Sequence, residues 1–261
     1  MYKTNYHIHN ELCKHAMGTV MDYADKAFEC GFDIIGMSDH APFRGNPYGF
    51  RMDFEEFEEY IFQVKEAKRK YEKRMKVLLG LEIEYMAKHR AYYDELREKY
   101  NMEYLILGQH FFDDGHGNEL YVYDLPDTTG YIDYAKSVEE ALGTGLFSMV
   151  AHPDLMFVHD FEWDYNCDKA CDIIVDAAVK YGVPLELNAN GVRKGKSRFV
   201  DGDRYPYPHF KLFEKISDAK VPVMINSDCH QLKELDDEAM KMSHELVKEW
   251  NLIYQDVLEL R

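Results

Sequence analysis

The chain of 261 residues has little positive charge and no long apolar run. Its 31 Lys and Arg residues are outnumbered by 48 Asp and Glu residues, which gives a formal net charge of −17. A general nucleic-acid-binding protein needs a basic face to neutralise phosphates, so this balance argues against one. No stretch approaches the ~20 consecutive apolar residues of a membrane span, and the first residues lack the apolar core of a secretion signal. We therefore expect no membrane partner and no export.

Cysteines are few and flexible linkers are missing. An odd number of cysteines, five, does not suggest a disulfide framework and favours a reducing cytoplasm. We find no low-complexity tract and no Gly/Ser-rich linker. Hydrophobic residues make up 46% of the chain, enough for a sizeable core, and one α/β barrel commonly takes about 250 residues. We expect a single domain over residues 1–261.

Short apolar runs alternate along the chain with stretches of helical periodicity. Strands are expected at Asn5–His9, Asp33–Ser38, Lys76–Glu84, Tyr104–Leu107, Leu146–Ala151, Pro184–Leu187 and Pro222–Asn226. Helices are expected at Met21–Cys30, Phe54–Arg74, Ala91–Tyr100, Tyr131–Leu142, Lys169–Tyr181, Phe210–Ala219 and Asp236–Trp250. Seven β-then-α repeats predict a parallel sheet, either closed into a barrel or open and doubly wound. No Gly-x-Gly-x-x-Gly turn follows the first strand, which weakens a dinucleotide-binding interpretation.

Histidine is abundant, and its positions are informative. Seven of the twelve histidines, with two carboxylates, fall at or just past predicted strand ends: His7, His9, His15, His40, Glu82, His110, His152, Asp228 and His230. In a β/α barrel those strand ends converge on one mouth. A lone histidine there is more often a hydrogen-bonded loop residue, but nine converging lone-pair donors predict a multinuclear metal site. The other five histidines are expected to be solvated, with His159 and His209 in loops at the mouth.

These motifs resemble those of the PHP (polymerase and histidinol phosphatase) family of metal-dependent phosphoesterases. The likeness covers the His-x-His opening and the segments Cys13–His15, Ser38–Pro42, Gly80–Glu82, Gly108–Phe111, Ala151–Asp154 and Ser227–His230. Within the family the sequence looks most like the histidinol-phosphate phosphatases, on the segments Arg51–Asp53, Glu186–Arg193 and Tyr205–Pro208. The resemblance implies an α/β fold, a distorted seven-stranded (β/α) TIM-like barrel, with three divalent metal ions (zinc, iron or manganese) at its C-terminal mouth.

Position by position, the resemblance also implies how the ligands are shared. His7, His9 and Asp228 would hold the first metal ion. His110 and His152 would hold the second, with Glu82 bridging the two. The third would be held by His15, His40 and His230.

Such a cluster of cations can bind the oxygens of a phosphate monoester and lower the pKa of a shared water. We expect a bridging hydroxide to attack phosphorus in line, with L-histidinol phosphate as the substrate and L-histidinol and inorganic phosphate as products. The proton donor to the leaving group is left open between Asp228 and a metal-bound water. Arg193 is expected to bind the phosphate, because a planar guanidinium can hold two oxygens at once. Lys194 and Lys196 are expected to be solvated, and a pocket could be shaped by Phe43, Tyr48, Phe111 and Asp154.

Three alternatives keep part of this interpretation. The same metal site could act on another small phosphate monoester, such as a sugar or nucleotide phosphate, and a substrate panel distinguishes the two. A catalytically silent metal-binding or regulatory protein is disfavoured by the full set of candidate ligands. A nuclease-like module is disfavoured by the charge of −17. The sequence assigns no role to the loops at 111–130 and 189–209.

Overall fold

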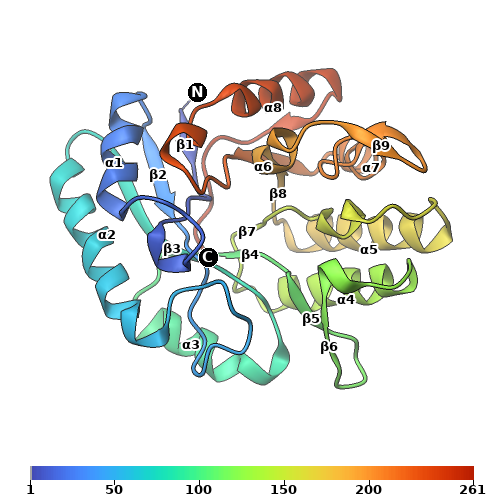
Figure 1. Ribbon diagram of the computed structural model, residues 1–261, viewed down its shortest axis with the longest axis horizontal. Helices are drawn as coiled ribbons and strands as arrows, with labels where there is room; N and C mark the ends of the chain where they lie inside the picture. The colour runs from blue at the N-terminus through green and yellow to red at the C-terminus, as the bar shows by residue number, and fades with distance from the viewer. Residues whose placement is uncertain (1) are drawn as a thin grey trace.

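The computed structural model describes residues 2–261 and is built around one curled parallel sheet (Figure 1). Eight strands pair in the order β1-β2-β3-β4-β7-β8-β11-β12. Their bounds are β1 Thr4–Asn5, β2 Ile34–Met37, β3 Lys76–Ile83, β4 Tyr104–Leu107, β7 Met149–Val150, β8 Leu185–Asn188, β11 Pro222–Asn226 and β12 Ile253–Tyr254. Every pairing between neighbours in this sheet is parallel, as the alternation of strands and helices predicts.

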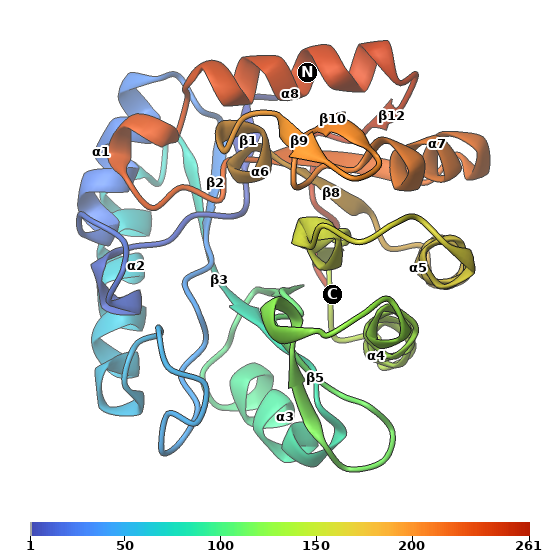
Figure 2. The same cartoon turned by 45° about the vertical axis from the view of Figure 1, so that its right-hand side comes forward.

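Helices surround the sheet on its outer side, as Figure 2 shows. They are α1 Val20–Glu29, α2 Phe57–Tyr71, α3 Arg90–Glu98, α4 Thr129–Gly143, α5 Tyr165–Tyr181, α7 Phe210–Ala219 and α8 Glu238–Glu249. The short helix α6, Ala189–Arg193, follows β8 and lies at the end of the barrel where Asn190 meets Asp228. Short 3₁₀ helices lie at Glu11–Cys13, Phe54–Glu56, Ala87–His89, Val122–Asp124, Leu155–Val158 and Leu232–Glu234. Among residues 2–261, no helix has both the length and the apolar character needed to cross a membrane.

The seven predicted strands are all present in the predicted order, and the structure adds elements that the pattern does not reveal. The sheet gains the two-residue strand β12, and α6 is a single short turn. The two long loops contain antiparallel hairpins: β5 (Phe111–Asp113) with β6 (Glu119–Tyr121), and β9 (Ser197–Phe199) with β10 (Gly202–Arg204). These elements are too short for a periodicity to show in the sequence.

The sheet curls until its first strand approaches its seventh. Ile8 forms a parallel bridge with Cys229, and the amide of His9 donates to the Cys229 carbonyl at 3.2 Å. Three residues before His9, the backbone amide of Tyr6 donates to Asn226 Oδ1 at 2.7 Å. The ring therefore has the shape of a distorted (β/α) barrel, with β12 beside β11 outside the closure.

The interior of this barrel has two layers. Its lower layer is apolar and contains Tyr6, Leu78, Tyr104, Ile106, Met149, Ala151, Met224 and Leu258, all buried. Glycine makes room for the largest ring there, because a Cβ on Gly80 would lie 2.3 Å from Tyr104. The upper layer is polar and includes His7, Glu82 and Glu186, each at most 1% exposed. The strand ends thus deliver polar side chains on top of a packed apolar floor.

Candidate metal centre

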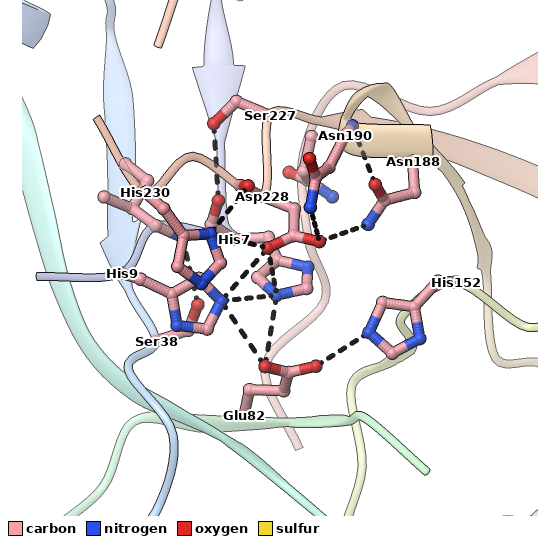
Figure 3. A network of polar contacts seen from close by, with 12 residues as sticks. His7, His9, Ser38, Glu82, His152, Asn188, Asn190, Ser227, Asp228 and His230 are labelled. Atoms are coloured by element: carbon pink, nitrogen blue, oxygen red, sulfur yellow. Dashed lines mark hydrogen bonds and ion pairs between the residues drawn. The ribbon is translucent and has the colours of Figure 1, made fainter. Parts of the chain in front are cut away.

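Glu82, near the end of β3, contacts histidines from several strands; Figure 3 shows it between His152 on one side and His7 and His9 on the other. Its Oε1 lies 2.8 Å from His152 Nε2 and 3.8 Å from His110 Nε2. Its Oε2 lies 2.9 Å from His40 Nδ1, and 3.4 Å from the Nε2 atoms of His7 and His9. Gly108 allows this position, because a Cβ there would lie 2.1 Å from Glu82 Oε1. Five imidazoles from separate parts of the chain therefore meet one carboxylate.

Asp228 approaches the same imidazoles from the other side. Its Oδ1 lies 3.2 Å from His9 Nε2 and 3.6 Å from His7 Nε2. Its Oδ2 accepts hydrogen bonds from the side-chain amides of Asn188 and Asn190. Burial alone would raise the pKa of Asp228, but His7 and His9 outweigh it and hold the pKa well below its usual value. An aspartate kept ionised in this way suits cation binding better than proton donation.

A second group of imidazoles lies closer to solvent. The Nε2 atoms of His15 and His230 are 2.9 Å apart, and the ring of His40 lies 5.3 Å from that of His15, centroid to centroid. The ring of His230 stacks on His9 at 4.2 Å, which joins this group to the inner one. The structure therefore brings all nine predicted ligands together at one mouth.

The donor set fits metal cations rather than a network of hydrogen bonds. His7 Nδ1 faces Glu186 at 3.0 Å and His9 Nδ1 faces Asp39 at 3.2 Å, so in neutral rings both Nδ1 atoms carry the proton. Their Nε2 lone pairs then face each other at 3.0 Å with no proton between them. Glu82 Oε2 likewise accepts no hydrogen bond from residues 2–261 although it is buried. Imidazole nitrogens and carboxylates that converge in this way are the donors that a divalent cation binds.

The outer histidines, His15 and His230, also direct Nδ1 at an acceptor and Nε2 at each other. His15 Nδ1 donates to the carbonyl of Cys13 at 2.8 Å, because a carbonyl can only accept. His230 Nδ1 faces the carbonyl of Asp228 at 3.3 Å. Their Nε2 lone pairs therefore also point at each other, and a further cation would resolve that contact.

Three buried carboxylates that orient these histidines carry no predicted role in the sequence. Glu186 holds His7 Nδ1 and accepts from the amide of His152 at 2.9 Å. Asp39 holds His9, and Glu84 holds His110 Nδ1 at 3.2 Å. Burial would raise the pKa of Glu84, but its ion pair with Arg51 and the contact with His110 hold it at about 2. The i, i+2 alternation at each strand end is the signal that could have found Glu186 and Glu84.

Two ligand positions have strained backbones. Asp228 has a φ of +44° and His152 a φ of +29°, in the left-handed region that residues with a Cβ rarely adopt. Strain of this kind persists only where the surroundings impose it, and it clusters at functional sites. Each is the second residue after a strand, β7 or β11, so the left-handed conformation occurs where the chain turns at the barrel mouth.

The position of Arg193 does not agree with the predicted phosphate contact. Its guanidinium pairs with Asp237 at 2.7 Å and donates to the carbonyls of Ser227 and Glu234. It also donates to Asn190 Oδ1 at 3.4 Å, and Arg193 does not line the cavity over the metal ligands. Arg193 therefore fastens α6 to the segment that contains Asp228, and its donors are used within the protein.

Two basic residues do line this cavity, Arg51, which is paired with Glu84, and Lys194. The cavity measures about 460 Å³ and is bordered by His15, His40, Glu82, His110, His152, Asp228 and His230. Within residues 2–261 the ammonium of Lys194 has no ion-pair or hydrogen-bond partner and lies 5.9 Å from the ring centroid of Tyr207. The expectation that Lys194 is merely solvated is therefore incomplete: it is exposed, but at the rim of the site.

Other predicted pocket residues divide between the cavity and the core. Tyr48 and Phe111 line the cavity, whereas Phe43 and Asp154 are buried away from it. His209 is 3% exposed and its ring pairs with Asp201, so it is neither solvated nor at the mouth. His159 is half-buried and its Nε2 lies 2.8 Å from the carbonyl of Val122. The five cysteines are free thiols.

Comparison with known proteins identifies the family. The profile of the PHP domain matches residues 5–190, which is most of the chain. This range contains seven of the nine predicted ligands, all except Asp228 and His230. The chain belongs to the PHP family. A probable histidinol-phosphatase of Deinococcus radiodurans is 29% identical over 232 residues, covering 86% of this chain and 85% of that protein. The histidinol-phosphatase of Bacillus subtilis is 24% identical over 262 residues, covering 88% of this chain and 94% of that protein.

The fold of this PHP protein is similar to that of a solved structure. The histidinol phosphate phosphatase of Lactococcus lactis, in complex with zinc, L-histidinol and phosphate, superposes with a TM-score of 0.75. The match covers 100% of this chain and 99% of that one, at 14% sequence identity. At this identity the likeness establishes the shared fold.

Proposed function

We propose that this PHP protein is a phosphatase that hydrolyses L-histidinol phosphate to L-histidinol and inorganic phosphate. The observation that carries the proposal is the convergence of imidazole nitrogens on Glu82 and Asp228 at the inner end of one cavity. The substrate is inferred from the relatives in Deinococcus radiodurans and Bacillus subtilis. They are named probable histidinol-phosphatase and histidinol-phosphatase, and their similarity covers most of this chain.

The residues divide into ligands and the groups that orient them. His7, His9 and Asp228 would hold one cation, and Glu82 would bridge it to a second held by His110 and His152. His15, His40 and His230 would hold a third. Bound divalent cations lower the pKa of water and neutralise the charge of a phosphate ester. Imidazole and carboxylate ligands of this kind bind zinc, iron and manganese.

The chain's own residues position the substrate and the ligands. Glu186 and Asp39 fix the tautomers of His7 and His9, so that their Nε2 lone pairs stay directed into the site. Lys194 at the rim is placed to meet a phosphate oxygen, and Arg193 holds the segment of Asp228 in position. Hydrolysis then adds water across the ester: the oxygen of water bonds to phosphorus, the bond from phosphorus to the ester oxygen breaks, and a proton of the water passes to the leaving alkoxide.

The free thiols suit a reducing cytoplasm, which we propose as its compartment.

A substrate panel tests the proposal. Phosphate release by the purified, metal-containing protein is compared for L-histidinol phosphate, sugar phosphates and nucleoside monophosphates. We expect kcat/KM for L-histidinol phosphate to exceed the others by at least about a hundredfold, which lies within the range that an apolar contact contributes to specificity. Equal rates on all esters would support the alternative, a PHP phosphoesterase for another small monoester.

A further inference from the structure

The cavity over the metal ligands has two chemically different walls. Asn190, Lys194 and Glu234 form a polar wall on the side of α6. A second part of the lining is aromatic and includes Tyr48, Phe50, Phe111, Tyr121 and Tyr123, which we call the aromatic wall. A phosphate monoester also has two unlike parts, the charged phosphate and the alcohol that it esterifies.

Four rings of the aromatic wall contact one another in a row, and the hairpin β5–β6 supplies the central two. Phe111 and Tyr121 face each other across the hairpin, with ring centroids 4.5 Å apart and planes at 21°. Tyr48 packs on Phe111 at 4.9 Å, and Tyr123 packs on Tyr121 at 5.2 Å. Within residues 2–261 the hydroxyls of Tyr121 and Tyr123 have no hydrogen-bond partner, so both are available to a ligand.

The hairpin is tied directly to the metal centre. Phe111 follows His110, and the amide of Val122 donates to the carbonyl of His110 at 2.8 Å. Tyr121 and Tyr123 flank Val122, which is fully buried. The stack is thus fixed relative to the ligands rather than carried on a free loop, as a binding wall requires.

Phe50 extends the wall toward solvent at a cost to the fold. Its side chain is 77% exposed, and its φ of +41° lies in the left-handed region. A bulky residue with this backbone is strained, and its exposed ring gains almost nothing from burial in return. The ring lies edge-on to His15, 5.9 Å between centroids, and so stands at the entrance above the outer ligands.

We propose that the aromatic wall is the subsite for the leaving group and selects alcohols that carry a planar, imidazole-like ring. The phosphate end of the ester is drawn to the cations and Lys194, so the alcohol must extend along the cavity past Phe111 and Tyr121. Stacked rings bind planar and cationic groups through their faces. This inference rests on the proposed function and deepens it, and it gives the 111–130 loop its role.

The test compares two esters of different alcohols. L-Histidinol phosphate has the ring, whereas 2-aminoethyl phosphate keeps an amine and the ester but has no ring. The measured quantity is the ratio of kcat/KM for the first ester to that for the second. We expect Phe50→Ala and Tyr121→Leu each to lower this ratio at least about tenfold, the low end of what an apolar contact contributes to specificity. Tyr165→Leu is the control, because Tyr165 is 75% exposed and does not line the cavity.

Binding of the free alcohols gives a second readout that needs no turnover. L-Histidinol and ethanolamine are titrated into the metal-containing protein by calorimetry, and we expect Phe50→Ala to weaken only the binding of L-histidinol. An unchanged ratio in both variants, or a proportional loss on both esters, would overturn the inference while the proposed function stands.

If the wild-type protein instead shows no preference for L-histidinol phosphate, the proposed function fails separately. The titrations then decide the role of the wall. Tighter binding of L-histidinol than of ethanolamine, lost in Phe50→Ala, would support the subsite, and equal binding would overturn it.

Discussion

The two layers of the barrel interior use the same strands for opposite purposes. Along β3, Leu78 lies in the apolar floor, Gly80 makes room for Tyr104, and Glu82 lies in the mouth. Along β11 and its extension, Met224 belongs to the floor and Asp228 to the mouth. Because side chains alternate with a period of two, each strand changes from apolar to polar within a few residues on one face.

This difference separates stability from function. Deleting atoms from the floor removes burial and leaves a cavity, which lowers the free energy of unfolding. The mouth holds converging carboxylates and imidazoles, which are costly to bury without cations. Substitutions in the floor are therefore expected to change stability, and substitutions in the mouth to change metal binding and activity.

The largest effect is expected at the centre of the mouth. Glu82→Gln keeps the shape but removes the negative charge that five imidazoles approach. We expect kcat/KM to fall by more than the ~10–100-fold typical of groups that only orient ligands, and bound metal to fall with it. Glu58→Gln, an exposed carboxylate on α2, is the matched control. Full activity in Glu82→Gln would show that this carboxylate is no ligand.

In the floor, Met224→Ala is expected to lower the free energy of unfolding by about 2–5 kcal/mol, because Met224 is 1% exposed among apolar neighbours. Urea denaturation measures this change, and the metal content of the folded protein should stay that of the wild type. Metal loss at unchanged stability would mean that the floor and the mouth are not separate.

A smaller effect is expected for a residue that orients ligands. Glu186→Gln replaces an oxygen that accepts from His7 or from the amide of His152 by a group that donates. Metal affinity, measured by competition with a chelator, should weaken by about 10–100-fold. Unaltered affinity would show that Glu186 does not orient His7.

The smallest effect is expected at the rim. Lys194→Ala should raise KM by about twofold to fivefold, because an exposed charge is screened by solvent. Lys194→Arg should retain a low KM, and added salt should shrink the difference. Lys196→Ala is the control, since Lys196 is also exposed but does not line the cavity. An equal rise of KM in both alanine variants would remove the specific role of Lys194.

The sequence predicts the strands and the ligand set for the same reason. Buried strands are continuous apolar runs, and their ends are marked by residues such as His110 and His152 that no apolar run would contain. Convergence then follows from the geometry of parallel strands, which brings nine side chains to one mouth.

What the sequence could not predict depends on contacts across the fold. Arg193 has the chemistry of a phosphate ligand, but Asp237, far along the chain, occupies it. The strand β12 consists of two residues and exists only because β11 offers it an edge. The hairpin β5–β6 shows no periodicity, so its aromatic stack emerges only in three dimensions.

The most direct measurement is the metal content of the purified protein by plasma emission spectrometry, combined with phosphatase activity before and after exhaustive chelation. The account predicts bound transition metal approaching three ions per chain, loss of activity on chelation, and recovery when metal is returned. Protein that contains no such metal and hydrolyses L-histidinol phosphate equally well after chelation would contradict it.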